Sequence, residues 1–114
     1  MRRGKEIAQG AHASLAFLVS RLQKSDCEDT VTIDLSPDEF SWIQGGETKI
    51  CVQVPSEYEL LDIHESALSK GISSHLIYDS GKTEFAGTRT LTACAIGPGR
   101  SDALQEVTGH LALY

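Results

Sequence analysis

The sequence predicts a single α/β domain over residues 1–114 in which a long first helix precedes alternating strands and helices. Apolar residues recur with helical spacing over residues 4–23, and β-branched residues are concentrated at 49–54. A strand over 49–54, a helix and a strand over 74–78 follow one another directly. This succession predicts a βαβ unit with parallel strands, and 114 residues suffice for one domain with its own core.

The first helix is expected over residues 4–23, and its sequence gives it two distinct faces. Lys5, Gln9 and His12 fall in one stripe, because helical residues three and four positions apart lie above one another. An apolar stripe lies roughly 130° away and is expected to pack against the core. Its members are Ile7, Ala11, Leu15, Leu18 and Leu22.

Two capping sequences mark the starts of further helices. Ser36 to Glu39 has proline at the first helical position and starts a short helix that Gly45 ends. Ser56 to Glu59 starts a helix that ends before Gly71. The remaining elements are a loop or marginal strand over 30–35, strands over 49–54, 74–78 and 90–96, and a helix over 101–108.

Composition limits the class of protein. The net charge of −6 argues against a protein that coats nucleic acid without discrimination. No apolar run approaches the roughly 20 residues of a membrane span, and no signal peptide is evident, so a soluble cytoplasmic protein is expected. Three cysteines without CxxC spacing suggest neither a disulfide framework nor a zinc site.

The turn Asp79-Ser80-Gly81-Lys82-Thr83 follows a predicted strand and combines a carboxylate, two hydroxyls and a cation around a glycine. Backbone N–H groups of such a turn can approach an anion, and an aspartate can orient or deprotonate water. The ordinary alternatives are a turn without function and a solvated helix edge. Cations that could bind substrate lie near both segments, namely Arg2, Arg3, Lys82 and Arg89.

Several common site motifs are absent from the sequence. Neither a phosphate loop GxxxxGK[ST] nor a GxGxxG fingerprint occurs, so a nucleotide cofactor has no support. No HExxH or comparable cluster of metal ligands occurs. The serine, cysteine and histidine residues are too scattered to pair a nucleophile with a base by spacing.

Four motifs in order resemble the type II peptidyl-tRNA hydrolase family, and together they run from the first residues to the last. They are Arg3-Gly4-Lys5 with Ala8-Gln9-Gly10-Ala11-His12-Ala13-Ser14, then Asp79 to Phe85, then Ala95-Ile96-Gly97-Pro98, and finally Thr108-Gly109-His110-Leu111. The resemblance implies an α/β/α domain around a four-stranded mixed sheet, often dimeric. It further implies cleavage of the ester between peptide and tRNA, with no metal or organic cofactor.

The resemblance places the functional positions of the family on Lys5, Gln9, His12, Asp79 and Thr83. Ester hydrolysis needs a positioned water and a donor for the developing oxyanion. Asp79 is expected to orient water or act as general base, with Lys5 on phosphate or the oxyanion. Gln9 and Thr83 would position the substrate, Gly81 and the nearby cations would bind it, and His12 stays open as an alternative base.

The sequence departs from the family pattern in two places. Ser80 and Lys82 stand where the family commonly has alanine and arginine, and lysine lacks the planar fork that arginine offers to phosphate. Family members carry a strand before the Gly-Lys motif, whereas this sequence begins on the motif and shows three strands. A closed sheet, a strand supplied across an interface, or an open groove would each accommodate the difference.

Three functions are compatible with the sequence. The first is hydrolysis of peptidyl-tRNA, which recycles tRNA from stalled translation. The second is a catalytically impaired domain of the same fold that binds tRNA or protein. The third, supported by the acidic net charge alone, is an interaction module unrelated to RNA.

Overall fold

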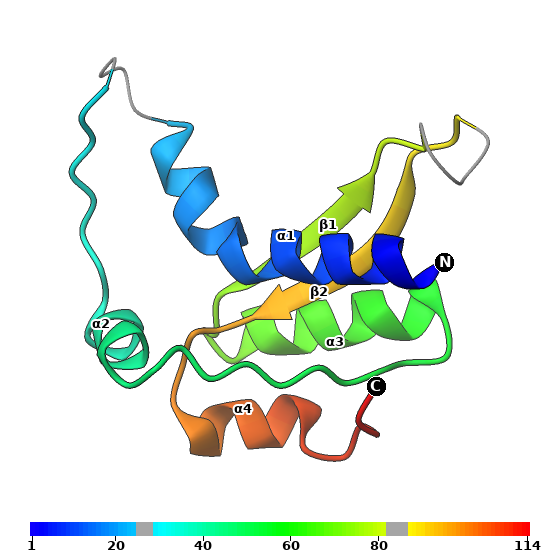
Figure 1. Ribbon diagram of the computed structural model, residues 1–114. Helices are drawn as coiled ribbons and strands as arrows, with labels where there is room; N and C mark the ends of the chain where they lie inside the picture. Colours follow the sequence, from blue (N-terminus) through cyan, green and yellow to red (C-terminus); the bar gives the residue numbers. More distant parts are fainter. Residues whose placement is uncertain (25–28, 82–86) are drawn as a thin grey trace.

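A β-hairpin forms the centre of the computed structural model, which describes residues 1–24, 29–81 and 87–114 (Figure 1). Strand β1 (Ser74–Asp79) pairs with strand β2 (Thr90–Ile96) in antiparallel orientation. Ser74 lies opposite Ile96 at one end of the hairpin, and Asp79 lies opposite Thr90 at the other. The predicted strands over 74–78 and 90–96 are therefore confirmed.

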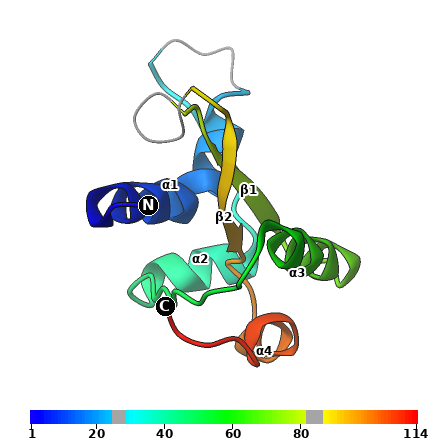
Figure 2. The ribbon, with the colours of Figure 1, turned by 90° about the vertical axis from the view of Figure 1, so that its right-hand side faces the viewer.

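Helices cover both faces of the hairpin and give the α/β/α layering that the resemblance implies (Figure 2). Helix α1 (Arg3–Leu22) packs on one face and helix α3 (Glu57–Ser69) packs on the other. Helix α4 (Ser101–Thr108) lies against α3, and helix α2 (Pro37–Gln44) lies beside the last turns of α1. None of the helices in the described part of the chain is long and apolar enough to cross a membrane.

The capping sequences start helices where they were predicted. Ser36 Oγ accepts the backbone N–H of Glu39, and the Glu39 carboxylate accepts the backbone N–H of Ser36, so the box before α2 is complete. Ser56 Oγ accepts the backbone N–H of Glu59 at 3.2 Å at the start of α3. These bonds satisfy N–H groups that the first helical turn leaves without a partner.

The apolar core is small and lies where α3, α4 and β2 meet. Ala67, Ile72 and Val107 are buried there. A second contact joins α1 to α2, where the rings of Phe17 and Trp42 meet edge to face at 5.9 Å between centroids. These two groups of side chains hold helices to each side of the hairpin.

An ion pair between Arg21 and Glu39 reinforces the contact between α1 and α2. The two guanidinium nitrogens of Arg21 donate to the two oxygens of Glu39 at 2.8 and 2.7 Å. The hydrogen bond from Arg21 is the main cause that lowers the pKa of Glu39, whose carboxylate is buried. The pair fixes the second half of α1, and with it the direction in which α1 crosses the hairpin.

The predicted strand over 49–54 and the parallel βαβ unit are both wrong. Within the described residues, Val52 is the one member of this segment in a β-bridge, and its partner is Leu113. The Gln53 N–H donates to the Ala112 carbonyl, so the C-terminal tail holds this segment. A β-branched composition predicts extended backbone but cannot identify the neighbour with which it pairs.

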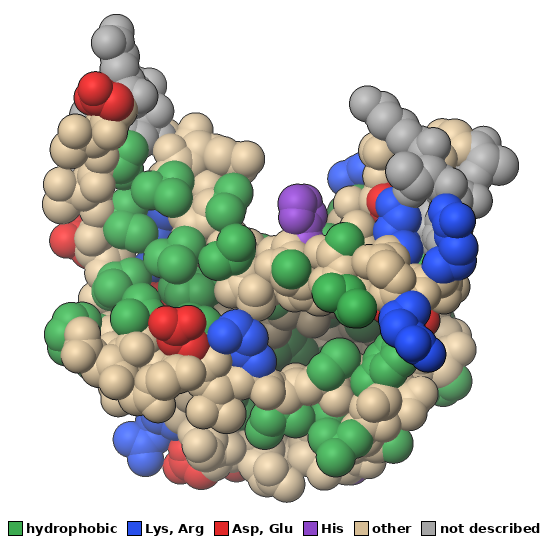
Figure 3. All heavy atoms as spheres, in the orientation of Figure 1, with side chains coloured by type: hydrophobic (Ala, Val, Ile, Leu, Met, Phe, Trp, Pro, Cys, Tyr) green, Lys and Arg blue, Asp and Glu red, His purple; other side chains and the backbone are tan. Residues whose placement is uncertain are grey.

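A groove of about 620 Å³ lies between the 49–54 segment and β2. Gln9 and Ala13 of α1 form part of one wall, and residues 91–96 of β2 line it as well. Figure 3 shows the hollow below α1. Of the three arrangements that the sequence left open, the single chain therefore has the open groove.

The expectation that the apolar stripe of α1 packs on the core is also wrong. Ile7 is 67% exposed and Leu15 is 53% exposed, whereas Gln9 and Phe17 on another face of α1 are buried. Helix α1 therefore turns the edge with Lys5 and Gln9 toward the hairpin. Both of these polar side chains find partners there, which accounts for the orientation of the helix.

Candidate functional site

The site is centred on an ion pair between Lys5 of α1 and Asp79, the last residue of β1. Lys5 Nζ lies 2.9 Å from Asp79 Oδ1, and the two side chains are 14% and 8% exposed. The other carboxylate oxygen, Oδ2, accepts the backbone N–H of Gly81 at 2.8 Å. A residue of the first helical turn and a residue 74 positions later thus share one site, as the sequence predicted.

These contacts keep the Asp79 carboxylate ionised. The hydrogen bond from Lys5 is the largest cause that lowers the pKa of Asp79, and the Gly81 N–H lowers it further. Hydrogen bonds to a carboxylate favour its charged form because they stabilise the negative charge. Near neutral pH the site therefore presents a fixed anion beside a fixed cation.

Gln9 lies one helical turn after Lys5 and is buried against β2. The Thr92 hydroxyl donates to Gln9 Oε1 and lies 3.3 Å from the Ile77 carbonyl oxygen. Because its oxygen is engaged by Thr92, the amide group of Gln9 is held in one orientation. Sequence reasoning missed Thr92, although a hydroxyl within the apolar run 90–96 was a signal that could have identified it.

Gly81 shapes the turn that orients Asp79. Its φ of +86° is disfavoured for any residue with a side chain, and a Cβ atom here would lie 2.3 Å from the Thr88 carbonyl oxygen. The Gly81 carbonyl accepts the N–H of Gly87 at 2.8 Å, which closes the base of the hairpin loop. The Gly81 N–H is already bound to Asp79, and a role for Gly81 in substrate binding stays a prediction.

The other residues predicted for the site lie in different surroundings. His12 is exposed on α1, whereas Lys5 and Gln9 face the hairpin, so the structure does not gather the three residues of the predicted stripe into one cluster. Lys82 and Thr83 lie outside the described residues. Arg89 stacks on the ring of Tyr78, with its Cζ atom 3.9 Å from the ring centroid.

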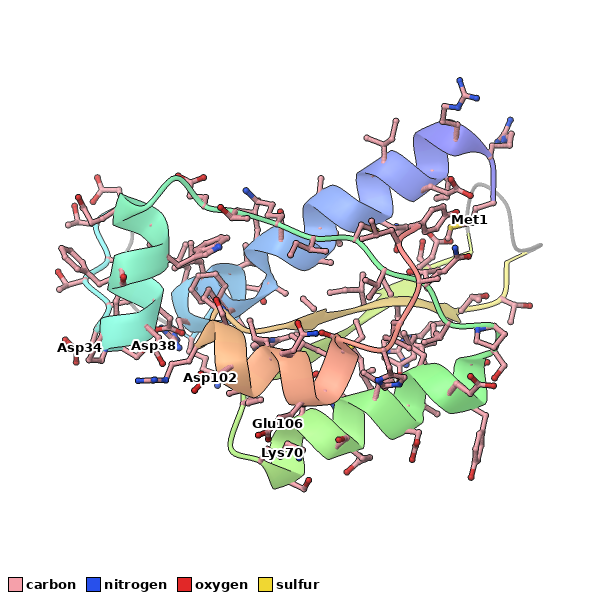
Figure 4. The ribbon with its side chains drawn as sticks, turned by 90° about the horizontal axis from the view of Figure 1, so that it is seen from below. Met1, Asp34, Asp38, Lys70, Asp102 and Glu106 are labelled. Atoms are coloured by element: carbon pink, nitrogen blue, oxygen red, sulfur yellow. The ribbon has the colours of Figure 1, made fainter. Side chains whose placement is uncertain are left out.

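Charge is distributed unevenly between the two ends of the molecule. Arg2 and Arg3 are exposed beside Lys5, and Arg89 precedes the strand residue that pairs with Asp79. Figure 3 shows Lys and Arg side chains gathered on this flank. Acidic side chains lie at the end away from Met1, among them Asp34, Asp38 and Asp102 (Figure 4). The negative net charge therefore does not describe the surroundings of the site.

A second group of reactive side chains lies between α3 and the hairpin. His64 Nδ1 lies 2.6 Å from Ser74 Oγ, which lies 3.1 Å from Cys94 Sγ. Burial raises the pKa of the Cys94 thiol, which disfavours the thiolate that a nucleophile would need. These contacts satisfy polar groups between two layers, and the described residues contain no cluster of three His, Cys, Asp or Glu side chains that could hold a metal ion.

Comparisons with known proteins identify the family of the chain. The family Peptidyl-tRNA hydrolase PTH2 matches residues 1–114. The chain is similar to Peptidyl-tRNA hydrolase of Methanocaldococcus jannaschii, with 38% identity over 99% of this chain and 89% of that protein. It is 36% identical to Peptidyl-tRNA hydrolase of Methanopyrus kandleri over 99% of this chain and 87% of that protein. It is 34% identical to Peptidyl-tRNA hydrolase 2, mitochondrial, of Bos taurus over 100% of this chain and 58% of that protein.

Proposed function

The chain belongs to the Peptidyl-tRNA hydrolase PTH2 family, and we propose that it hydrolyses the ester bond between peptide and tRNA in peptidyl-tRNA. The observation that carries this proposal beyond family membership is the ion pair of Lys5 and Asp79. It joins a cation and an ionised carboxylate beside a buried amide, Gln9. Such a set of groups can hold a water molecule and stabilise negative charge.

Asp79 acts on the attacking water in this proposal. Its lowered pKa makes the carboxylate a weak base near neutral pH, because efficient general bases have pKa values close to the working pH. Its ionised oxygens remain strong acceptors for the hydrogens of a water molecule. We therefore assign Asp79 to orientation of the water, and His12 stays an alternative site for proton removal.

Lys5 supplies the positive charge at the reacting centre. As the ester is attacked, its carbonyl oxygen becomes negative, and an ammonium group near that oxygen stabilises the transition state more than the ground state. Gln9 is expected to position the same end of the substrate from one turn further along α1. Thr83, Lys82 and Gly81 stay predicted substrate contacts of the adjoining turn.

The cations at the start of α1 are assigned to the tRNA backbone. Arg2 and Arg3 lie in the residues that open α1, whereas Arg89, near the end of the hairpin that carries Asp79, stays a predicted substrate contact of another kind. Contacts between such side chains and phosphates release bound counterions, so the affinity for tRNA should fall as salt rises. A salt titration thus separates this function from an interaction module unrelated to RNA.

Hydrolysis of a peptidyl-tRNA by purified variants tests the proposal. Asp79→Asn and Lys5→Ala should each lower kcat/KM at least tenfold, about 1.4 kcal/mol or more of lost transition-state stabilisation. Asp102→Asn, an exposed change on α4, is the matched control. Wild-type rates in both site variants would refute the assignment. A wild-type chain that binds tRNA without cleaving it would instead favour the catalytically impaired domain.

The assembly and location of the protein stay predictions. A homodimer is expected from the resemblance, and light scattering on the purified chain measures its mass directly. A cytoplasmic location is expected from the sequence, and fractionation of cells tests it.

A further inference from the structure

An exposed stack of two planar groups adjoins the site. The Arg89 guanidinium lies over the Tyr78 ring with Cζ 3.9 Å from its centroid, whereas the other cation–π contacts of the described residues measure 5.7 and 5.3 Å. The short separation indicates that the cation lies directly on the ring. Tyr78 is nevertheless 39% exposed, so the stack is at the surface and not part of the core.

The stack lies within one residue of Asp79 on both strands. Tyr78 directly precedes Asp79 on β1, and Arg89 directly precedes Thr90, the residue that pairs with Asp79. Neighbouring side chains of a strand point to opposite faces of a sheet. Since Asp79 points toward α1, Tyr78 points toward the face that α3 covers, and the two groups occupy the two sides of one hairpin end.

The chemistry of the pair suits a nucleobase. Unpaired bases stack on aromatic rings and on the planes of arginine side chains, and stacking needs a flat surface that is already formed. The Arg89 guanidinium lies over the Tyr78 ring with Cζ 3.9 Å from its centroid, and among the described residues no carboxylate forms an ion pair with Arg89. A contact with phosphate alone would need only the charge, which a lysine also supplies.

We propose that the stack of Tyr78 and Arg89 binds an unpaired nucleobase of the RNA strand whose terminal ribose carries the ester. This inference rests on the proposed function, which places the terminal ribose at Lys5 and Asp79. An RNA strand whose terminal ribose lies at Lys5 and Asp79 reaches the stack by passing the end of the hairpin. The stack stands beside that end, so it receives a base while Arg2 and Arg3 remain on the opposite side for phosphates.

Binding of a short RNA tests the stack separately from catalysis. The probe is an RNA hairpin with an unpaired 3′ end that contains 2-aminopurine, whose fluorescence falls when the base stacks. Tyr78→Ala and Arg89→Lys should each raise the dissociation constant roughly 5- to 100-fold, as expected for one lost stacking contact. Tyr78→Phe should recover most of the binding that Tyr78→Ala loses. Tyr58→Ala, an exposed tyrosine on α3, is the matched control.

The probe without its unpaired end distinguishes stacking from attraction to phosphate. If the stack binds a base, the variants and the wild type bind this blunt RNA equally well, and the variants raise KM for peptidyl-tRNA more than they lower kcat. Equal losses on both RNAs would overturn the proposal, because they indicate a contact with the backbone. Wild-type affinity of Arg89→Lys and Tyr78→Ala would overturn it as well. Lack of hydrolysis by the wild type would contradict the proposed function, while the fluorescence of the probe would still decide the role of the stack.

Discussion

The turn after β1 should not tolerate a single added methyl group at Gly81. A Cβ atom at this position would lie 2.3 Å from the carbonyl oxygen and 2.5 Å from the amide nitrogen of Thr88. Both are backbone atoms, so no side chain can rotate away to make room. Gly87 provides the matched control, because its φ of +82° is similar to the +86° of Gly81 but a Cβ atom there meets no atom of the described residues within 4 Å.

The structure separates the two contributions to the cost of Gly81→Ala. A side chain in the left-handed region costs about 1 to 2 kcal/mol, which Gly87→Ala shares. The overlap in Gly81→Ala additionally moves the backbone near Thr88 and disturbs the hydrogen bonds of Gly81 with Gly87 and Asp79, each worth about 1 kcal/mol. Gly81→Ala should therefore lower the free energy of unfolding by about 3 to 4 kcal/mol, and Gly87→Ala by about 1 to 2 kcal/mol.

Urea unfolding and hydrolysis of peptidyl-tRNA measure the two effects independently. Gly81→Ala should lower kcat at least tenfold at a temperature where the variant is folded, because Asp79 loses one of the donors that fix its carboxylate. Gly87→Ala should keep a rate close to that of the wild type. Equal stability and equal rates in the two variants would show that the backbone around Thr88 can move at little energetic cost and that Gly81 does not fix Asp79.

Two further predictions concern the ion pairs. Lys5→Met should raise the pKa of Asp79, because the lysine is the main cause that lowers it, and carbon-13 NMR of the Asp79 carboxyl group should show its protonation at higher pH than in the wild type. The pair stabilises the folded wild type above the pKa of an unfolded aspartate and loses that effect as pH falls through the lower folded value. The thermal unfolding temperature of the wild type should therefore fall more steeply on acidification than that of Lys5→Met. An equal dependence on pH in the two proteins would contradict this linkage. Glu39→Gln should lower the free energy of unfolding by about 2 to 3 kcal/mol. This is somewhat less than the cost of breaking a fully buried ion pair, because Arg21 is partly exposed. Asp38→Asn, at an exposed position, is the control and should change the free energy of unfolding little.

Local sequence predicted the helices because their ends are determined by neighbouring residues. The complete capping box of Ser36 and Glu39 spans four positions, and α2 begins at Pro37 as expected. The partner of an extended segment is not a local property. Residues 49–54 are bridged to Leu113 of the tail and not to a neighbouring strand, and nothing within the segment itself indicates this.

The orientation of α1 shows the same limit at the site. Helical spacing correctly separated an apolar stripe from an edge with Lys5 and Gln9, but it could not decide which of them packs against the sheet. Hydrophobicity alone favours burial of Ile7, which is in fact 67% exposed. Two residues of the hairpin decide the orientation of α1. Asp79 binds Lys5 from 74 positions further along the chain, and Thr92 binds Gln9 from 83 positions further along.

The separation of charge within the molecule explains how an acidic protein can present a site for a polyanion. The molecule extends 38 Å along its longest axis, whereas electrostatic interactions in water are screened over about 8 Å at physiological ionic strength. Phosphates near Arg3 and Lys5 therefore interact mainly with the cations of that flank and little with Asp34 or Asp102 at the other end (Figure 4). The cations of the site flank favour encounters in which the hairpin end with Asp79 meets the substrate first.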